Sequence, residues 1–403
     1  MTRSGYEEDA YEEDAYVAAL SALPGMGPAN LASILRNYEP QAAWRAVQAG
    51  TLRRPPGRPE TPVLGSEGCY ERRPGVEWRS LTAKVDPPEW WRPIAARGIH
   101  VTWSGQPEFP EALMSDPSPP GAVFWRGRLE ALRDPCVAVV GTRNATSCGI
   151  ATAYELGRDL TAAGVCVVSG LAIGIDGAVH RGAVDAAKGG APSAPVAVVA
   201  SGVDVVYPKR NERLWEQVAA CGSVLSETAP GRPAQAWRFP SRNRIIAGLA
   251  RLVVVVESHS RGGSLITAEA ALARGVEVRA VPGAVRSAAS AGTNQLLYEG
   301  AGPVRDATDV LDSLGMFDTS KPSRLPGQWE RLPGQPAGLP GFDCLQLSSL
   351  ARSVLDSMGW YPVTPNQVVL TGGISPGEAL QVLDELVERG EVVENAGLYT
   401  RVR

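Results

Sequence analysis

The stretch QAWRFPSRNRIIAGLARLVVVVE, residues 235–257, combines a helix pattern with a strand pattern. Its second half places a short apolar helical segment, Ile245–Leu249, before a run typical of a buried strand, Leu252–Val256. Its first half gathers aromatic and cationic side chains, and Thr228–Val256 contains five arginines and no acid. A cationic turn that opens a helix offers phosphates both charge and free backbone N–H groups. The stretch therefore predicts an anion site.

On both sides of this stretch, short apolar runs alternate with Ala-rich segments of helical length. The expected strands are Val137–Val140, Val165–Ser169, Val196–Ala200, Ser223–Ser226, Leu252–Glu257 and Val276–Val281. Strands that are apolar on both faces and alternate with helices predict a doubly wound, mostly parallel α/β sheet. Ligands of such sheets bind beyond the carboxyl ends of the strands.

The 403 residues are enough for two or three domains. Residues 1–16 hold six acids against one arginine and predict a flexible tail. We expect a helical domain at 17–50, an irregular lead-in and sheet domain at 76–312, and a third domain at 343–403. The helical domain resembles a helix-hairpin-helix unit, although a plain α-hairpin fits equally well. Pro- and Gly-rich composition predicts linkers or insertions at 51–75 and 313–342.

The overall composition argues against several classes of protein. A formal charge of −4 argues against a generally basic nucleic-acid protein, so any basic face must be local. The six cysteines contain no CxxC pair, which argues against a metal site or a disulfide framework. No apolar run approaches the ~20 residues that span a bilayer, and the first residues are acidic. We expect a cytoplasmic protein without membrane contact.

Small, hydroxyl and cationic residues follow the expected strands. In order, the chain contains GTRNAT (141–146), SGLAIGID (169–176), GVDVVYPKRN (202–211), FPSRNRIIAGL (239–249), VVVVESHSRGGSLITAEAAL (253–272), AVPG (280–283) and GTNQLLYEGA (292–301). These motifs resemble, in order and spacing, those of the DNA-processing protein A family, DprA, also called Smf. One departure is visible, because the family usually has Ser-Gly-Ser-Leu where this chain has Gly262-Gly263-Ser264-Leu265.

The resemblance implies an extended Rossmann-like domain that binds single-stranded DNA, forms a homodimer and loads the RecA recombinase, without cofactor or catalysis. Residues of the dimer surface would be Leu296 and Leu297. Carried over by position, the DNA-binding residues would be Arg143, Ser169, Gly170, Lys209, Phe239, Arg242, Asn243, Arg244, Gly263, Ser264 and Thr267.

The residues by themselves are compatible with this function. A positive groove with aromatic faces holds single strands, and Phe239 beside Arg242 and Arg244 supplies both elements. Ordinary core packing is the other interpretation of Phe239 and Trp237. For the acids Asp176, Asp204 and Glu257 we expect helix capping or ion pairs with the arginines.

The C-terminal segment predicts three helices, Ser348–Met358, Pro365–Leu370 and Ser375–Arg389, followed by strands Glu391–Val393 and Leu398–Val402. This order resembles a winged helix, which the family often carries. Residues 344–403 hold seven acids and four arginines, so protein contact is favoured over DNA contact.

Two other functions stay open. Gly262-Gly263 with Thr267 and Glu269 faintly resembles the loop of nucleotide phosphoribohydrolases, which would make the chain an enzyme. A regulatory nucleotide sensor is the other possibility. The sequence lacks GxxxxGK[ST], GxGxxG, HExxH and GxSxG motifs, which favours a binding protein.

Overall fold

The computed structural model describes residues 3–52, 78–316, 349–358, 363–388, 391–395 and 398–401. The chain divides into two compact units, Met1–Ser320 and Lys321–Arg403, which we describe separately. The linkers expected at 51–75 and 313–342 lie mostly outside the described residues.

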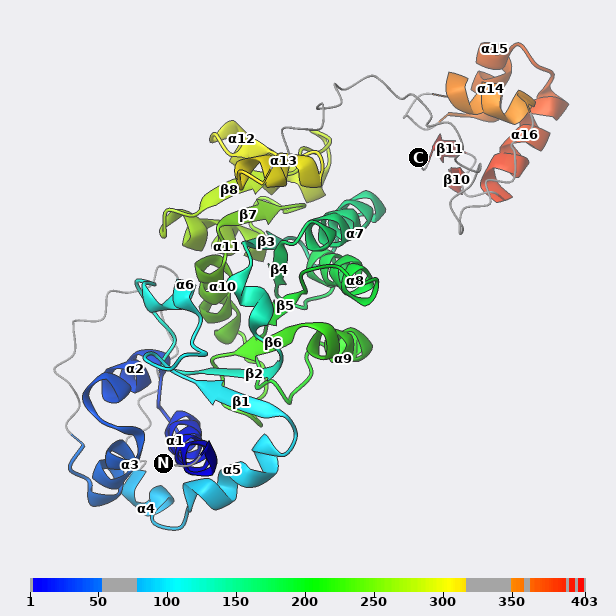
Figure 1. Cartoon of the computed structure of the whole chain (residues 1–403). Coiled ribbons are helices and arrows are strands. Elements are labelled where there is room, and N and C mark those ends of the chain that lie inside the picture. Colours follow the sequence, from blue (N-terminus) through cyan, green and yellow to red (C-terminus); the bar gives the residue numbers. More distant parts are fainter. Residues whose placement is uncertain are drawn as a thin grey trace. The chain divides into compact units, whose positions relative to one another are not determined.

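A nine-stranded sheet in the order β1-β2-β6-β5-β4-β3-β7-β8-β9 forms the centre of the first unit (Figure 1). Strands β3 to β9 pair in parallel. Their bounds are β3 Cys136–Val140, β4 Cys166–Ser169, β5 Val196–Val198, β6 Ser223–Ser226, β7 Leu252–Val255, β8 Glu277–Ala280 and β9 Gly302–Pro303. The predicted doubly wound, mostly parallel sheet is confirmed, and each of the six expected strands is present.

Two further strands, β1 (Ile99–Thr102) and β2 (Val123–Gly127), continue the sheet beyond β6. Both pairings, β1 with β2 and β2 with β6, are antiparallel. The sequence predicted an irregular lead-in here, which is wrong for these residues. These strands are only four and five residues long and lie among prolines, so the sequence pattern alone does not predict them. They are identified by their hydrogen bonds to neighbouring strands of the sheet.

Helices cover both faces of the sheet (Figure 1). Both faces must be covered because the strands are apolar on both. In β3, for example, Val137 and Val139 enter one core whereas Ala138 and Val140 enter another. The first core contains side chains of α7 (Ser147–Ala162), α8 (Ile175–Lys188) and α13 (Ala307–Ser313). The second contains side chains of α6 (Glu111–Met114), α10 (Arg238–Leu249), α11 (Gly263–Leu272) and α12 (Ala291–Tyr298). Helix α9 (Glu212–Cys221) packs against β6 and β2.

The N-terminal helices share a third core with the antiparallel edge of the sheet, where Leu20, Trp91 and Phe124 are buried together. The helices are α1 (Arg3–Ala22), α2 (Pro28–Asn37), α3 (Pro40–Ala49), α4 (Trp78–Thr82) and α5 (Pro87–Ala95). An α-hairpin at 17–50 is therefore present as a structure.

The flexible tail expected at residues 1–16 is not what the structure shows, because α1 already begins at Arg3. Tyr11, Ala15 and Ala18 recur at helical spacing and pack toward the third core, which outweighs the solvation of the intervening acids.

The second unit consists of α14 (Ser349–Ser357), α15 (Pro365–Gly372), α16 (Pro376–Glu388) and the antiparallel pair β10 (Val392–Asn395) and β11 (Leu398–Arg401). These are the three helices and two strands that the sequence predicted, and they enclose their own core. The Ser375 hydroxyl accepts from the Glu378 N–H at 3.3 Å, as in the predicted capping box. The assignment as a winged helix stays a prediction.

Candidate nucleic-acid interface

The strand order reverses where β3 lies between β4 and β7, and the loops beyond the carboxyl ends of β3, β4 and β5 converge near this point. The first turns of α10 approach these loops from the side of the sheet that carries the second core. A pocket opens there, lined by Arg143, Gly170, Ala172, Ile173, Val199, Ala200, Ser201, Tyr207, Pro208, Phe239 and Arg242.

A cation and two aromatic rings form one wall of this pocket. The guanidinium carbon of Arg143 lies 4.8 Å from the centroid of the Phe239 ring, a cation–π contact. The Tyr207 ring lies 5.7 Å from the Phe239 ring at 55°. Arg143 is exposed and Tyr207 is 46% exposed, and no acid lines this pocket in the described part of the chain. The wall offers both positive charge and flat apolar surface.

Arg242 forms the floor of the pocket. It is 6% exposed and donates to the Gly170 carbonyl at 2.7 Å, to the Val198 carbonyl at 2.5 Å and to Asn243 Oδ1 at 3.0 Å. A Cβ atom at Gly170 would lie 2.2 Å from Arg242 Nη1, so the guanidinium needs a glycine there. Burial lowers the pKa of Arg242 to about 10, against the attraction of Asp176, so the side chain stays cationic at neutral pH.

Two buried groups on α8, Asp176 and His180, interact electrostatically with Arg242. Burial raises the pKa of Asp176, and the charge of Arg242 and backbone hydrogen bonds from Gly141 and Ala172 oppose this rise. The charges of Asp176 and Arg242 therefore stabilise each other. One turn later, burial lowers the pKa of His180 to about 3, which keeps its imidazole neutral at neutral pH.

The expected free amides at the opening of α10 are absent. The N–H of Arg238 donates to the Gln235 carbonyl at 3.0 Å, and that of Phe239 to the Ala236 carbonyl at 3.3 Å. Pro240 has no N–H. Because α10 begins at Arg238, the arginines at 242 and 244 lie within the helix and not in a turn ahead of it. Attraction for an anion must come from side chains here.

The N-terminus of α7 is occupied by a carboxylate of the chain itself. Glu257, which follows β7, accepts from the Thr146 N–H at 2.9 Å and from the Thr146 hydroxyl at 2.5 Å. A Cβ atom at Gly149 would lie 2.3 Å from the Glu257 carboxyl carbon. Helix capping, expected for Glu257, is confirmed. A nucleotide phosphate would compete for this place with a built-in anion.

Two predicted DNA contacts, Lys209 and Asn243, lie near the pocket without lining it. Lys209 follows Pro208, has 79% of its side chain exposed, and lies 3.5 Å from Glu212. The Asn243 amide donates to the Gly263 carbonyl at 3.4 Å, which joins α10 to the start of α11. Asp204 makes an ion pair with Arg97 at 3.2 Å, the kind of role expected for it, although the partner is not one of the central arginines.

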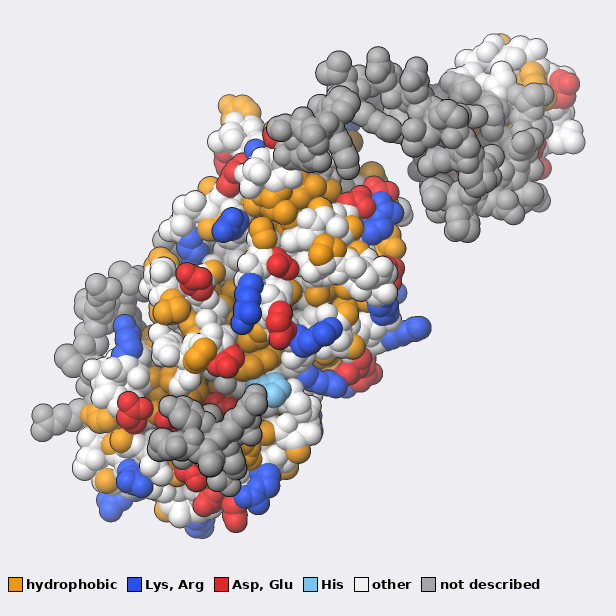
Figure 2. Space-filling view, viewed as in Figure 1, with side chains coloured by type: hydrophobic (Ala, Val, Ile, Leu, Met, Phe, Trp, Pro, Cys, Tyr) orange, Lys and Arg blue, Asp and Glu red, His pale blue; other side chains and the backbone are white. Residues whose placement is uncertain are grey.

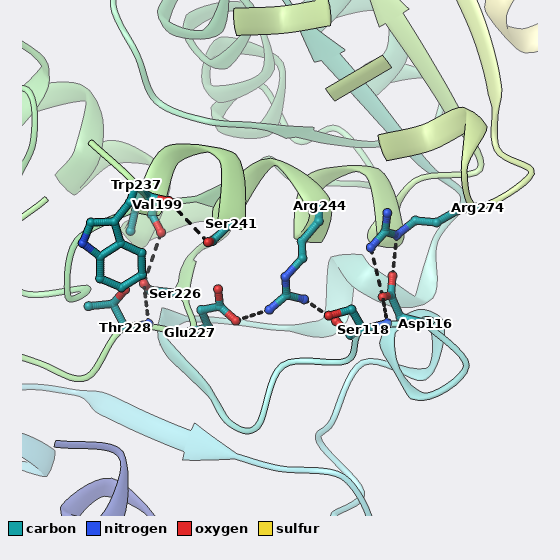
Figure 3. Close-up of polar contacts among 10 residues, drawn as sticks. All are labelled: Asp116, Ser118, Val199, Ser226, Glu227, Thr228, Trp237, Ser241, Arg244 and Arg274. Carbon is teal, nitrogen blue, oxygen red and sulfur yellow. Dashed lines mark hydrogen bonds and ion pairs between the residues drawn. The ribbon is translucent and has the colours of Figure 1, made fainter. Parts of the chain in front are cut away.

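Arg244 points to a different side of α10, where it pairs with Glu227 and donates to the Ser118 carbonyl (Figure 3). Its role is structural, like that of Arg274 with Asp116 at 2.7 Å in the same view. It lies two positions after Arg242, so the helical repeat turns the two guanidiniums apart by about 200°.

The predicted hydroxyl contacts are buried inside the protein. Ser169 donates to the Val139 carbonyl at 2.7 Å, and Thr267 is 1% exposed. Ser264 donates to Ser258 Oγ at 2.9 Å. A Cβ atom at Gly262 would lie 2.3 Å from the same Ser258 Oγ. The hydroxyl of Ser258 thus fills the space that a serine at 262 would need.

The expected dimer residues differ in their surroundings. Leu296 is 9% exposed and belongs to the core beneath α12, and Leu297 packs partly against that core. The exposed apolar side chain of this helix is Tyr298, at 87%. A dimer contact through α12 would use Tyr298 and the exposed part of Leu297.

Sequence reasoning omitted Tyr207 from the site. Its position directly before Pro208 and Lys209, after a strand, could have marked it as an aromatic of the rim. The apolar lining residues Ile173, Val199 and Ala200 carried no comparable pattern.

A sequence model of the family described as DNA recombination-mediator protein A matches residues 100–315. These residues include all of the pocket and of the parallel sheet. The chain belongs to the DNA recombination-mediator protein A family. The resemblance to DprA and Smf proteins is thereby confirmed.

Three relatives show how far this similarity extends. A "DNA processing protein DprA" of Streptococcus pneumoniae is 42% identical over 192 residues, which are 48% of this chain and 66% of that protein. A "Protein Smf" of Synechocystis is 28% identical over 405 residues, covering 95% of this chain and 97% of the relative. The solved structure of DNA processing protein A from Streptococcus pneumoniae superposes with a TM-score of 0.58 at 29% identity, over 75% of this chain and 97% of that one.

Among the described residues, no helix combines the length and apolar character needed to cross a bilayer. Within the same residues, no group of three or more His, Cys, Asp or Glu side chains is arranged to hold a metal ion.

Proposed function

We propose that this protein binds single-stranded DNA at the pocket wall formed by Arg143, Phe239 and Tyr207. The observation that carries the proposal is a cation stacked on Phe239, which is partly buried and pairs with the exposed Tyr207 ring at the carboxyl edge of the sheet. The names of the relatives, DNA processing proteins, support the same class of ligand.

Stacking gives the expected affinity and its tolerance of sequence. A base that lies on Phe239 or Tyr207 contributes about 1–3 kcal/mol, whichever base it is. Arg143 and Lys209 then meet the phosphates on either side of the base. Duplex DNA hides its base faces, so unpaired strands are the preferred ligand.

The positive charge is local. Basic and acidic side chains are intermixed over the face of the protein seen in Figure 2, in line with a formal charge of −4. Binding therefore depends on a few phosphate contacts, and we expect these contacts to produce a marked dependence on salt.

The family name, a recombination mediator, supports a further step. We propose that the bound strand is protected and transferred to the RecA recombinase, and that the protein acts as a homodimer. Leu297→Arg tests the dimer by light scattering: a mass of one chain is expected, and a mass still twice the chain would remove α12 from the interface. Filament growth of RecA on strands coated by a single-strand-binding protein, with and without this protein, tests the loading step.

No observation favours a phosphoribohydrolase. Thr267 is buried and Glu269 is exposed, two positions apart on α11, so the two do not meet in the pocket. A nucleotide sensor would need the N-terminus of α7, which Glu257 occupies.

The deciding experiment is a binding titration of labelled oligo(dT) and of a duplex of equal length at several salt concentrations. We expect preference for the single strand, and we expect Arg143→Ala and Lys209→Ala each to weaken binding and to lower the salt slope by about one. Arg251→Ala is the matched control, because Arg251 is exposed at the amino end of β7, away from the pocket edge. Equal affinity for duplex, or no effect of either pocket variant, would overturn the proposal.

A further inference from the structure

We propose that Trp237, together with Arg238 and Arg232, forms a second base-stacking subsite for the same strand, next to the pocket. This inference rests on the single-strand binding proposed above. It assigns a role to a side chain that does not line the pocket.

The indole of Trp237 is large, partly exposed and held in place. It directly precedes α10 and is 49% exposed. Its Nε1–H donates to Gln235 Oε1 at 2.9 Å, and the Arg238 guanidinium carbon lies 5.0 Å from the ring centroid. Arg238 is fixed in turn by the Pro233 carbonyl at 2.6 Å. A ring held by two polar contacts and still half exposed is preorganised for stacking.

The segment that carries Trp237 is tied to the pocket loop. The Gly202 N–H donates to the Arg232 carbonyl at 2.9 Å, and the Gly231 N–H donates to Asp204 Oδ1 at 2.8 Å. The segment after β6 is thus fixed beside the loop after β5, and that loop contributes Tyr207 to the pocket. Figure 3 shows Trp237 at the amino-terminal end of α10, with Arg244 farther along the helix.

Helix geometry directs the side chains of Trp237 and Phe239 to different sides of α10, although the two residues are close in the chain. Trp237 and Phe239 are two residues apart at the start of α10, which turns their side chains about 200° from each other. A strand that stacks on both must cross the first turn of α10. The two rings then serve neighbouring parts of one strand and not the same base.

The charge around Trp237 suits this path. Arg232 is exposed and anchored by one nitrogen to the Ala22 carbonyl at 2.6 Å. Asp204, the acid that holds this segment, already pairs with Arg97 at 3.2 Å. Phosphates that approach Trp237 therefore meet two arginines and a compensated carboxylate.

The test uses the full chain and labelled oligo(dT) of increasing length, followed by fluorescence anisotropy. Phe239→Ala should weaken binding at every length. Trp237→Ala should match the unchanged protein on the shortest oligomer that binds and lose about 5- to 150-fold on longer ones, the range measured for one stacked base. Trp237→Phe should retain most of the affinity because it keeps an aromatic face. Met114→Ala, a side chain of similar exposure at 53% on α6, is the control.

The outcomes separate this inference from the function on which it rests. If the unchanged protein fails to bind single strands, the proposed function is wrong. If it binds and Trp237→Ala equals it at all lengths, only the second subsite is wrong. A loss shared equally by Trp237→Phe and Trp237→Ala would also overturn the subsite, since it would show a packing role and not a stacking one.

Discussion

Arg242 illustrates how one side chain can build a site through hydrogen bonds to its own chain. Its guanidinium joins the carbonyls of Gly170 and Val198, at the ends of β4 and β5, to α10. Arg143, which contacts Phe239 from the β3 loop, is exposed. The same residue type therefore builds the pocket in one case and provides its accessible charge in the other.

We expect Arg242→Ala to destabilise the fold by about 3–5 kcal/mol, because it leaves two carbonyls unsatisfied and the buried Asp176 without its compensating charge. Denaturant unfolding measures the loss. Arg143→Ala is the control, since it should reduce DNA binding and leave the unfolding midpoint unchanged. Equal midpoints for both variants would contradict the structural role of Arg242.

His180 predicts a pH effect of defined sign. Burial lowers the pKa of His180 to about 3, so the unfolded chain binds this proton more tightly. Its contribution to stability is complete above the unfolded pKa of about 6.5 and is lost as the pH falls toward 3, by about 1.4 kcal/mol per pH unit. Relative to the unchanged protein, His180→Gln should gain stability as the pH falls from 7 to 5. Parallel stability curves would contradict this.

Asp14 acts in the opposite direction over the same range. Burial, followed by repulsion from Glu108 and Glu13, raises the pKa of Asp14 to about 7. A raised carboxyl pKa stabilises the fold at low pH, and this contribution is lost as the pH rises from about 4 to 7. Asp14→Asn should therefore gain stability over the unchanged protein as the pH rises through this range. Thermal unfolding at pH 4 and pH 8 measures it, and an equal difference at both would contradict it.

At the scale of elements, α7 is held to the sheet by an anion that β7 supplies. Glu257 and the Thr146 hydroxyl accept hydrogen bonds from the backbone N–H groups of Thr146 and Gly149 at the start of this 16-residue helix. In sheets that bind a phosphate at this helix end, the end is free, whereas here Glu257 occupies it. Under the proposed function, the neighbouring loops contact the strand instead.

Glu257→Ala should cost about 1–2 kcal/mol of stability, because it removes a buried cap and a favourable charge at the helix N-terminus. Inorganic phosphate should then raise the melting temperature of the variant more than that of the unchanged protein. Glu269→Ala, an exposed acid on α11, is the control. If phosphate stabilises both proteins equally, Glu257 does not take the place of a bound anion.

At the scale of the whole molecule, the second unit has its own core and an acidic composition. Residues 344–403 hold seven acids and four arginines, so we expect them to add no favourable phosphate contact. Removal of residues 321–403 should leave the affinity for single strands and its salt slope within about twofold. Titration of both forms at two salt concentrations checks this, and a reduced slope would assign DNA contact to this unit.

The sequence by itself determined the fold class, because strands buried on both faces must be apolar throughout and the helices between them must cover both faces. It also determined the family, through motifs in fixed order, and it placed Arg143 in the loop after β3. It did not place Arg242 and Arg244, which lie within α10 and not in a turn ahead of it. It could not show the antiparallel edge formed by β1 and β2, because these short runs form strands only through hydrogen bonds to neighbouring strands that are distant in sequence.

Only the tertiary structure decided which side chains of the cluster face solvent. Arg242 and Arg244 differ by two positions, yet one forms the pocket floor and the other pairs with Glu227. The direction of a side chain on a helix follows from which face packs against the sheet, and that is a long-range contact. For the same reason, Arg143, Tyr207 and Phe239 become one wall only when the loops after β3 and β5 meet the first turn of α10.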